Sequence, residues 1–302
     1  MTHVTSFKNR PTLRIGGVPE HFNTPWHLAI DSGAFDDLPI DVSWQDYHGG
    51  TGALTKALDA REIDAALVLT EGVLKYLAAG GPSKLVGTYV SSPLLWGIHV
   101  HADSDMHEVE DLERATWGIS RKGSGSHLMS VVSASEKMWP IDKLSFQIVR
   151  SMRGAQEAMD ENRNIAFMWE KFTTKPLVDA GHWRRVDTFA APWPAFLFVI
   201  SDHADEAFSA HLVDVLERVR RFCPGDDPHN PNFVEHVSMR YDQRPEDVQE
   251  WFVQTQWRSH CVLDKSRLSQ ALGSLNSLGL TDVQDKSASL DAWLHPVAAW
   301  ST

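Results

Sequence analysis

A strand that runs into a glycine- and serine-rich turn and then a helix most constrains how this chain folds. Residues 117–120 (WGIS) are a short apolar run typical of a buried strand, and residues 128–138 carry apolar side chains at helical spacing. The turn at 123–126 (GSGS) combines glycines, which turn the backbone at little steric cost, with serines, which cap free helical N–H groups. It is either an ordinary capped connection or, through its N–H donors and the helix dipole, a site for an anion or a polar ligand edge.

The same order of strand, turn and helix recurs on both sides of this unit. Such alternation predicts parallel sheets with right-handed crossovers. Because residues 64–69 form a continuous apolar run, we expect a strand buried on both faces. The expected strands are 11–18, 40–47, 64–69, 84–90, 94–100, 115–120, 145–149, 165–169, 184–189 and 195–200. The expected helices are 25–34, 51–60, 70–79, 126–138, 154–160, 171–180, 204–222, 231–240, 245–258 and 264–278.

Two strand-like crossings, near 92–97 and 192–196, divide this pattern into two α/β units. A chain of 302 residues is long enough for two such units, each with its own core. The fold class expected is therefore α/β, with two lobes and a helical C-terminal segment. We expect lobe 1 to comprise residues 1–94 and 196–302, and lobe 2 to comprise residues 95–195.

Charge and composition limit the partners. The formal net charge of −12 argues against nucleic acid and anionic membranes. No apolar run approaches the length of a membrane span, so no membrane insertion is expected. Residues 1–10 lack the apolar core of a secretion signal, which favours a cytoplasmic protein, or a periplasmic one if a signal has been removed. Cys223 and Cys261 are read as reduced thiols, with one disulfide left open.

Four segments carry a resemblance to a known family: GVPEHFNTPWHLAIDSGAF, HGGTGALTKALDAREIDAALVLTEG, HADSDMHEVEDLERATWGISRKGSGSH and LDKSRLSQALGSLNSLGL. Over roughly residues 11–280 the chain resembles the type II periplasmic-binding-protein fold. It is similar to the branch that binds sulfonates, taurine, nitrate and thiamin-pyrimidine precursors. The resemblance implies lobes that close on a small molecule like a Venus flytrap, with no cofactor. A transporter partner is compatible with it but is not indicated by the sequence.

The same branch includes a thiamin-pyrimidine synthase, whose chemistry this chain lacks the residues to perform. The resemblance places Val68 and Gly72 where that family has a lysine and a histidine. The cysteine cluster of that family is also absent. We therefore do not expect the synthase reaction.

Ligands of open α/β sheets bind beyond the carboxyl ends of the strands, at helix N-termini. Five loops meet that rule: 19–26, 48–51, 70–72, 123–127 and 169–170. Together with tryptophans at the crossings, they supply the expected ligand-binding residues: His21, Asn23, Trp26, His48, Gly50, Thr51, Thr70, Glu71, Trp96, Ser124, Gly125, Ser126, His127, Trp169, Glu170 and Trp193.

Several of these residues also have a purely structural reading. Each tryptophan is as well suited to packing in a core or hinge as to lining a ligand. Glu71 and Glu170 are either ligand acceptors or carboxylates that stabilise the first turn of a helix. If both face the cleft, they favour a ligand with hydrogen-bond donors, whereas the turn at 124–127 favours an acidic or polar end.

A histidine-rich segment, HVHADSDMH, offers His99, His101, Asp103 and His107. Alternation places His99 and His101 on one face of a strand, a usable spacing for metal ligands. In the family pattern this segment is an exposed strand end and loop. We therefore interpret it as surface and expect no metal.

The function predicted is binding, without catalysis, of a small polar or anionic organic molecule of aromatic or heteroaromatic character. The alternative is an enzyme on the same fold that uses His48, Glu71 and His127 for acid–base chemistry. A sulfinate-cleaving hydrolase of this fold needs a cysteine in the first lobe, and this chain has none before Cys223. A protein-interaction module is a third class, and would have a dispensable cleft.

Overall fold

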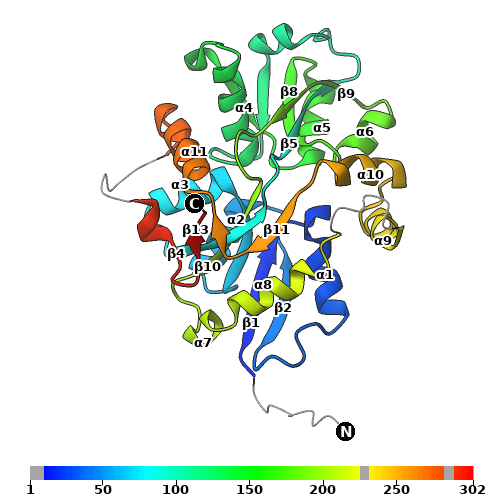
Figure 1. Ribbon diagram of the computed structural model, residues 1–302. Helices are drawn as coiled ribbons and strands as arrows, with labels where there is room; N and C mark the ends of the chain where they lie inside the picture. Colours follow the sequence, from blue (N-terminus) through cyan, green and yellow to red (C-terminus); the bar gives the residue numbers. More distant parts are fainter. Residues whose placement is uncertain (1–9, 225–230, 282–288, 302) are drawn as a thin grey trace.

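The computed structural model describes residues 10–224, 231–281 and 289–301, which form two mixed sheets with helices packed on them (Figure 1). Within these ranges the first sheet has the order β11-β4-β10-β3-β1-β2 and the second β7-β6-β8-β5-β9. The first sheet contains β1 (Thr12–Gly17), β2 (Asp41–Asp46), β3 (Ala65–Leu69), β4 (Ser83–Val90), β10 (Phe196–Ser201) and β11 (Trp257–His260). The second contains β5 (Leu95–His101), β6 (Thr116–Ile119), β7 (Ser145–Ile148), β8 (Ile165–Glu170) and β9 (Trp183–Ala190).

The helices follow the strands as the sequence pattern predicts. Those of the first half are α1 (Thr24–Asp31), α2 (Thr51–Asp59), α3 (Thr70–Ala78), α4 (Gly125–Glu136), α5 (Met152–Glu161) and α6 (Lys175–Asp179). The C-terminal ones are α7 (Glu206–Ser209), α8 (Leu212–Arg220), α9 (Pro231–Tyr241), α10 (Pro245–Val253) and α11 (Lys265–Ser277). A small pair, β12 (Val262–Leu263) and β13 (Ala299–Trp300), lies beside them.

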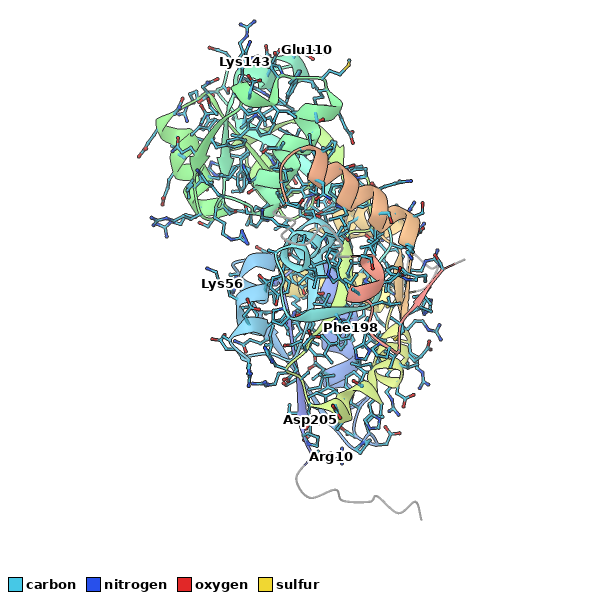
Figure 2. The ribbon with its side chains drawn as sticks, turned by 90° about the vertical axis from the view of Figure 1, so that its left-hand side faces the viewer. Arg10, Lys56, Glu110, Lys143, Phe198 and Asp205 are labelled. Atoms are coloured by element: carbon cyan, nitrogen blue, oxygen red, sulfur yellow. The ribbon has the colours of Figure 1, made fainter. Side chains whose placement is uncertain are left out.

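The two sheets belong to two lobes that lie end to end. In Figure 2, Glu110 and Lys143 lie at one end of the molecule, and Arg10 and Asp205 at the other. The chain passes between the lobes from β4 to β5 and from β9 to β10. The two-lobed α/β fold is therefore confirmed, while the exact division at 94/95 and 195/196 stays a prediction. In the described part of the chain, no helix combines the length and apolar character that crossing a membrane requires.

The two strands that directly follow the interlobe crossings, β5 and β10, are antiparallel to their neighbours. β1 pairs in parallel with β2 and β3, and β6 with β7 and β8, as the alternation predicts. However, β10 is antiparallel to both β3 and β4, and β5 to both β8 and β9. The parallel pairing predicted from the alternation therefore does not extend to β5 and β10, because each follows a direct crossing rather than a helical crossover.

The core explains the apolar runs. β10 is buried along its whole length and β3 along all but its last residue, because both have strands on either side and helices over their faces. Phe198, labelled in Figure 2, is fully buried at the centre of β10. Cys223 and Cys261 are free thiols and form no disulfide.

The C-terminal region differs from the sequence prediction in one element that matters. The predicted helix 245–258 ends at Val253, and the chain then forms β11 on the outer edge of the first sheet. Trp257 is the reason, because its indole donates a hydrogen bond to the Phe22 carbonyl at 3.0 Å and its ring lies 5.3 Å from that of Trp251. This tertiary contact outweighs local helix propensity.

Gly87 allows β11 to approach β4. A Cβ atom at this position would lie 1.9 Å from the carbonyl oxygen of His260, so a side chain forces the two backbones apart. We expect Gly87→Ala to lower the free energy of unfolding by about 1–3 kcal/mol, as overpacking does. Gly273 in α11 is the matched control, because a Cβ there meets nothing within 4 Å. Gly273→Ala should raise stability by about 0.5–1 kcal/mol, and equal effects of the two changes in urea unfolding would contradict this interpretation.

Candidate functional site

A cavity of about 570 Å³ lies between the lobes, in the size range of sites for small organic molecules. Its walls come from both sheets: the loop after β1, the N-terminal ends of α2 and α3, the turn between β6 and α4, and the end of β8. These are the carboxyl ends of strands and the starts of helices, where the fold places exposed backbone N–H groups.

Many of the residues predicted for the site line this cavity, and others lie behind it. The lining residues are His48, Gly50, Thr51, Glu71, Trp96, Ser124, Gly125, Ser126, Trp169 and Glu170. The predicted residues outside the lining are His21, Asn23, Trp26, Thr70, His127 and Trp193.

The residues behind the lining support it. Trp26 is fully buried and its ring lies 5.7 Å from that of Phe198, so it is part of the core. Asn23 donates to the Val18 carbonyl at 2.7 Å, and Thr70 donates to the Pro194 carbonyl at 2.5 Å. These side chains fix the loop after β1 and one interlobe crossing.

Trp193 and His127 each hold a neighbour in place. The buried indole of Trp193 donates to Glu71 Oε2 at 2.9 Å and thereby fixes a cavity carboxylate. His127 Nδ1 accepts from the backbone N–H of Gly123 at 3.1 Å, and its ring meets Phe146 edge-on at 4.7 Å. His127 therefore stabilises the turn and does not contact the cavity.

The turn between β6 and α4 is held in place by its own serine side chains. Ser124 is the helix N-cap, and its Oγ accepts from the His127 N–H at 3.4 Å. Ser126 Oγ accepts from the Ser120 N–H at 3.1 Å and so ties the turn to β6. A Cβ at Gly125 would lie 2.7 Å from the Trp96 ring, so the indole packs directly on the first turn of α4.

Sequence reasoning missed the cations of the cavity, which are Lys56, Lys75, Arg121, Lys122 and Arg153. The Arg121 guanidinium lies over the first turn of α2, where a Cβ at Gly52 would fall 1.4 Å from its Nη2. Burial lowers the pKa of Arg121 from its usual value, and no carboxylate among the described residues forms an ion pair with it. The pair Arg121–Lys122 directly before the glycine-serine turn was the available signal.

Three carboxyl groups also border the cavity, and one of them, Glu20, was not predicted. Burial, with repulsion from Glu170, raises the pKa of Glu20 to about 8. Burial raises the pKa of Glu71 to about 7, and its Oε1 has no hydrogen-bond partner among the described residues. Burial likewise raises the pKa of Glu170, although three hydrogen bonds from Phe172 and Thr173 oppose the shift.

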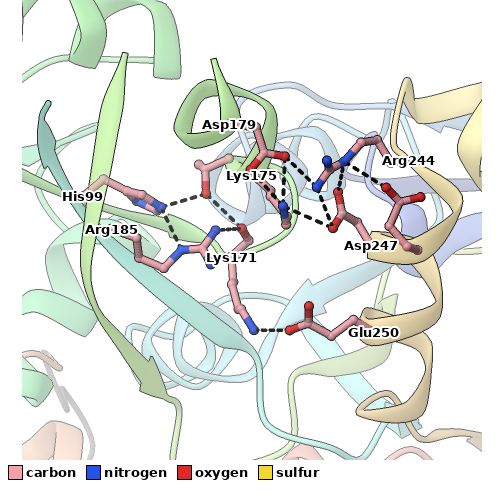
Figure 3. Close-up of polar contacts among 10 residues, drawn as sticks. His99, Lys171, Lys175, Asp179, Arg185, Arg244, Asp247 and Glu250 are labelled. Atoms are coloured by element: carbon pink, nitrogen blue, oxygen red, sulfur yellow. Dashed lines mark hydrogen bonds and ion pairs between the residues drawn. The ribbon is translucent and has the colours of Figure 1, made fainter. Parts of the chain in front are cut away.

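The histidine-rich segment is at the surface at Asp103 and His107, as the sequence suggested, but not at His99. His99 is fully buried in β5, where its Nε2 lies 3.0 Å from Thr174 Oγ1 and 3.5 Å from Arg185 Nε (Figure 3). Burial lowers its pKa to about 3, so the ring is neutral. Within the described ranges, no three His, Cys, Asp or Glu side chains gather as metal ligands would.

A network of ion pairs joins the end of β8 and α6 in lobe 2 to α10 (Figure 3). Lys171 Nζ lies 2.7 Å from Glu250, Lys175 Nζ 3.2 Å from Asp247, and Arg244 2.9 Å from Asp179. Because α10 precedes β11 of the first sheet, the network connects the two lobes beside Glu170.

Asp247 is the most buried carboxylate of this network and pairs with both Lys175 and Arg244. We expect Asp247→Asn to lower the free energy of unfolding by about 1–3 kcal/mol, since it removes charge-assisted hydrogen bonds. Glu246→Gln is the matched control, because Glu246 lies in the same helical turn but is exposed and contacts the network only through Arg244, at 3.5 Å. Urea unfolding should show a change within about 0.5 kcal/mol for the control, and an equally small effect of Asp247→Asn would contradict the role given to the network.

The raised pKa of Glu20 predicts a pH dependence of stability. In the unfolded chain this carboxyl ionises near its ordinary value of 4.5, whereas in the folded protein it holds its proton to about pH 8. The folded state therefore binds more protons in this window, and the contribution of Glu20 to stability is lost as pH rises through it. Glu20→Gln lacks this loss, so its melting temperature relative to wild type should increase from about pH 5 to about pH 8.5. Parallel melting curves across that range would contradict the assignment.

Comparison with known proteins agrees with this architecture. A family model described as Ca3427-like PBP matches residues 96–189. The Candida albicans CA3427 gene product, described as defining a new family with the generic periplasmic binding protein fold, is 25% identical, with a TM-score of 0.84 over 95% of this chain and 97% of that one. Among curated protein sequences no match was found.

Two further structures are similar in fold. The alkanesulfonate-binding protein SsuA from Xanthomonas axonopodis pv. citri, bound to MOPS, is 16% identical, with a TM-score of 0.77 over 97% of this chain and 100% of that one. The periplasmic nitrate-binding protein NrtA from Synechocystis is 17% identical, with a TM-score of 0.65 over 94% of this chain and 86% of that one. The chain therefore has the type II periplasmic-binding-protein fold. Its segment 96–189 is similar to the Ca3427-like family of that fold.

Proposed function

We propose that the protein binds a small polar or anionic organic molecule, aromatic or heteroaromatic in character, in the cavity between its lobes. The observation that carries the proposal is Arg121, a half-buried cation without an acidic partner in the described chain, beside the N-terminal ends of α2 and α4. A helix N-terminus and a guanidinium together stabilise an anionic group. The formal charge of −12 repels anions, so a local cation is needed at the site.

The aromatic part of the ligand is assigned to Trp96 and Trp169. Both line the cavity, one at the start of β5 and the other at the end of β8, and β5 pairs with β8. Trp96 packs on the first turn of α4, next to the donors proposed for the anion. An indole wall beside a few fixed polar groups suits a small planar molecule.

The acid–base alternative required His48, Glu71 and His127 to act together. His48 and Glu71 line the cavity, but His127 does not, and its Nδ1 is occupied by the Gly123 N–H. No observation therefore favours this alternative over binding.

Relatives support a binding role, while the compartment remains a prediction. SsuA is described as binding alkanesulfonates and NrtA as binding nitrate, and NrtA is described as periplasmic. A related structure from Staphylococcus aureus is described as the ligand-binding component of an ABC-type import system. For this chain, a periplasmic location and a transporter partner rest on these likenesses, and a cytoplasmic location rests on the sequence.

Arg121→Met tests the proposal directly. A thermal-shift screen of sulfonates, pyrimidines and aromatic acids, MOPS included, supplies the probe compound. For the anionic compound that stabilises the protein most, we expect Arg121→Met to weaken binding about tenfold or more in calorimetry, since a charge-assisted hydrogen bond is lost. Arg114→Met is the matched control, because Arg114 is exposed and outside the cavity.

Gly125→Val is a second variant for the same test, since its side chain would displace Trp96 from the first turn of α4. Unchanged affinity in a folded Arg121→Met protein, or no binding by wild type to any compound of the screen, would contradict the proposed function.

A further inference from the structure

Two carboxyl groups from different lobes meet at one part of the cavity. Glu20 follows β1 in lobe 1 and Glu170 ends β8 in lobe 2, and both line the cavity. His21, the neighbour of Glu20 in the chain, has its Nε2 3.8 Å from Glu170 Oε2, so the loop after β1 lies against the end of β8. Three hydrogen bonds from the turn at 172–173 to Oε2 hold the Glu170 carboxylate in place. Like charges in such a position repel, unless a cation or a proton lies with them.

The surroundings of this pair supply no counter-charge by direct contact. His21 Nε2 lies 3.8 Å from Glu170 Oε2, but burial lowers the pKa of His21 to about 3, so the ring is neutral. Arg185 acts on Glu170 from β9, but its Nη2 donates to the Lys171 carbonyl at 2.9 Å (Figure 3). Among the described residues, neither Glu20 nor Glu170 has a lysine or arginine within ion-pair distance.

Glu71 is an independent indication that the ligand carries a hydrogen-bond donor. Its side chain is 1% exposed and borders the cavity from α3. Trp193 satisfies Oε2, but Oε1 has no partner among the described residues. A buried acceptor left unpaired destabilises the free protein, and a donor on the ligand would remove that cost. Trp96 Nε1, also buried at the cavity wall, lacks an acceptor in the same way.

We propose that Glu20 and Glu170 receive a cationic or N–H-rich group of the ligand, such as a protonated amine or an amidine, and that Glu71 accepts a hydrogen bond from the same ligand. This inference rests on the proposed function, in which Arg121 receives an anionic group of the same molecule. The ligand is then dipolar. Because the two groups belong to different lobes, a cation that displaces the proton held by Glu20 is attracted to both carboxylates and stabilises the arrangement in which the two lobes meet.

Matched pairs of compounds test the inference. Each pair contains an anion and the zwitterion made by adding a cationic group to it: propanesulfonate with 3-aminopropanesulfonate, benzoate with 4-(aminomethyl)benzoate, and benzoate with 4-amidinobenzoate. Calorimetry would measure the affinity of wild type, Glu20→Gln, Glu170→Gln and Arg121→Met for every compound. Glu113→Gln, an exposed glutamate outside the cavity, is the control.

We expect wild type to bind the cationic member of at least one pair about tenfold more tightly than its partner, as charge-assisted hydrogen bonds allow. Glu20→Gln and Glu170→Gln should each remove most of that preference, whereas Glu113→Gln should keep it. Because the carboxylates bind a cation only when ionised, the preference should grow as pH rises from about 6 toward the Glu20 pKa of about 8. In the Gln variants it should not change with pH in this way.

The outcomes separate the inference from the proposed function. If affinity depends on Arg121 but the amino or amidino group adds nothing, the cavity still binds an anion and the dipolar ligand is wrong. If the preference survives both Gln variants, its assignment to Glu20 and Glu170 is wrong. If wild type binds none of these compounds and none of the anions of the wider screen, the proposed function fails and this inference fails with it.

Discussion

The antiparallel insertion of β10 between β3 and β4 is the constraint on which the two-lobed arrangement depends. Residues Phe196–Ser201 are buried along their whole length, so this strand is fixed by backbone pairing on both sides and by the core over its faces. The chain reaches it directly from β9, the edge strand of the other sheet. The return crossing therefore ends in a fully buried strand of lobe 1, which places the cleft between the carboxyl ends of both sets of strands.

Charge is distributed unevenly around this cleft. The chain is acidic overall, yet the cavity contains several cations, and Arg121 has no acidic partner among the described residues. Carboxyl groups from both lobes border the same space, and burial raises their pKa values because it disfavours the charged form. Both features lower stability in the free protein. Such features persist at functional sites, because a ligand supplies the missing partners.

Much of the fold follows from local sequence, whereas much of the site does not. The apolar run before Thr70 and the capped start of α4 are visible because burial on both faces and helix capping leave periodic signals. β11 has no such signal, since Trp257 adopts a strand only through contacts with Phe22 and Trp251. Trp26 and Trp193 follow the same loop pattern as Trp96, but packing alone decides which ring faces the cavity. Glu20 lies in a loop, where charge without periodicity cannot be distinguished from ordinary surface, and the only signal for Arg121 is its place directly before the glycine-serine turn.

A crystal structure of the protein with the compound that stabilises it most in a thermal-shift screen tests the central claim most directly. The account predicts that the compound lies between the two sheets, with its anionic group within hydrogen-bond distance of Arg121 and the first turn of α4, and its ring against Trp96 or Trp169. A compound bound outside this cavity, or one held in it with the anionic group turned away from Arg121, would contradict the account.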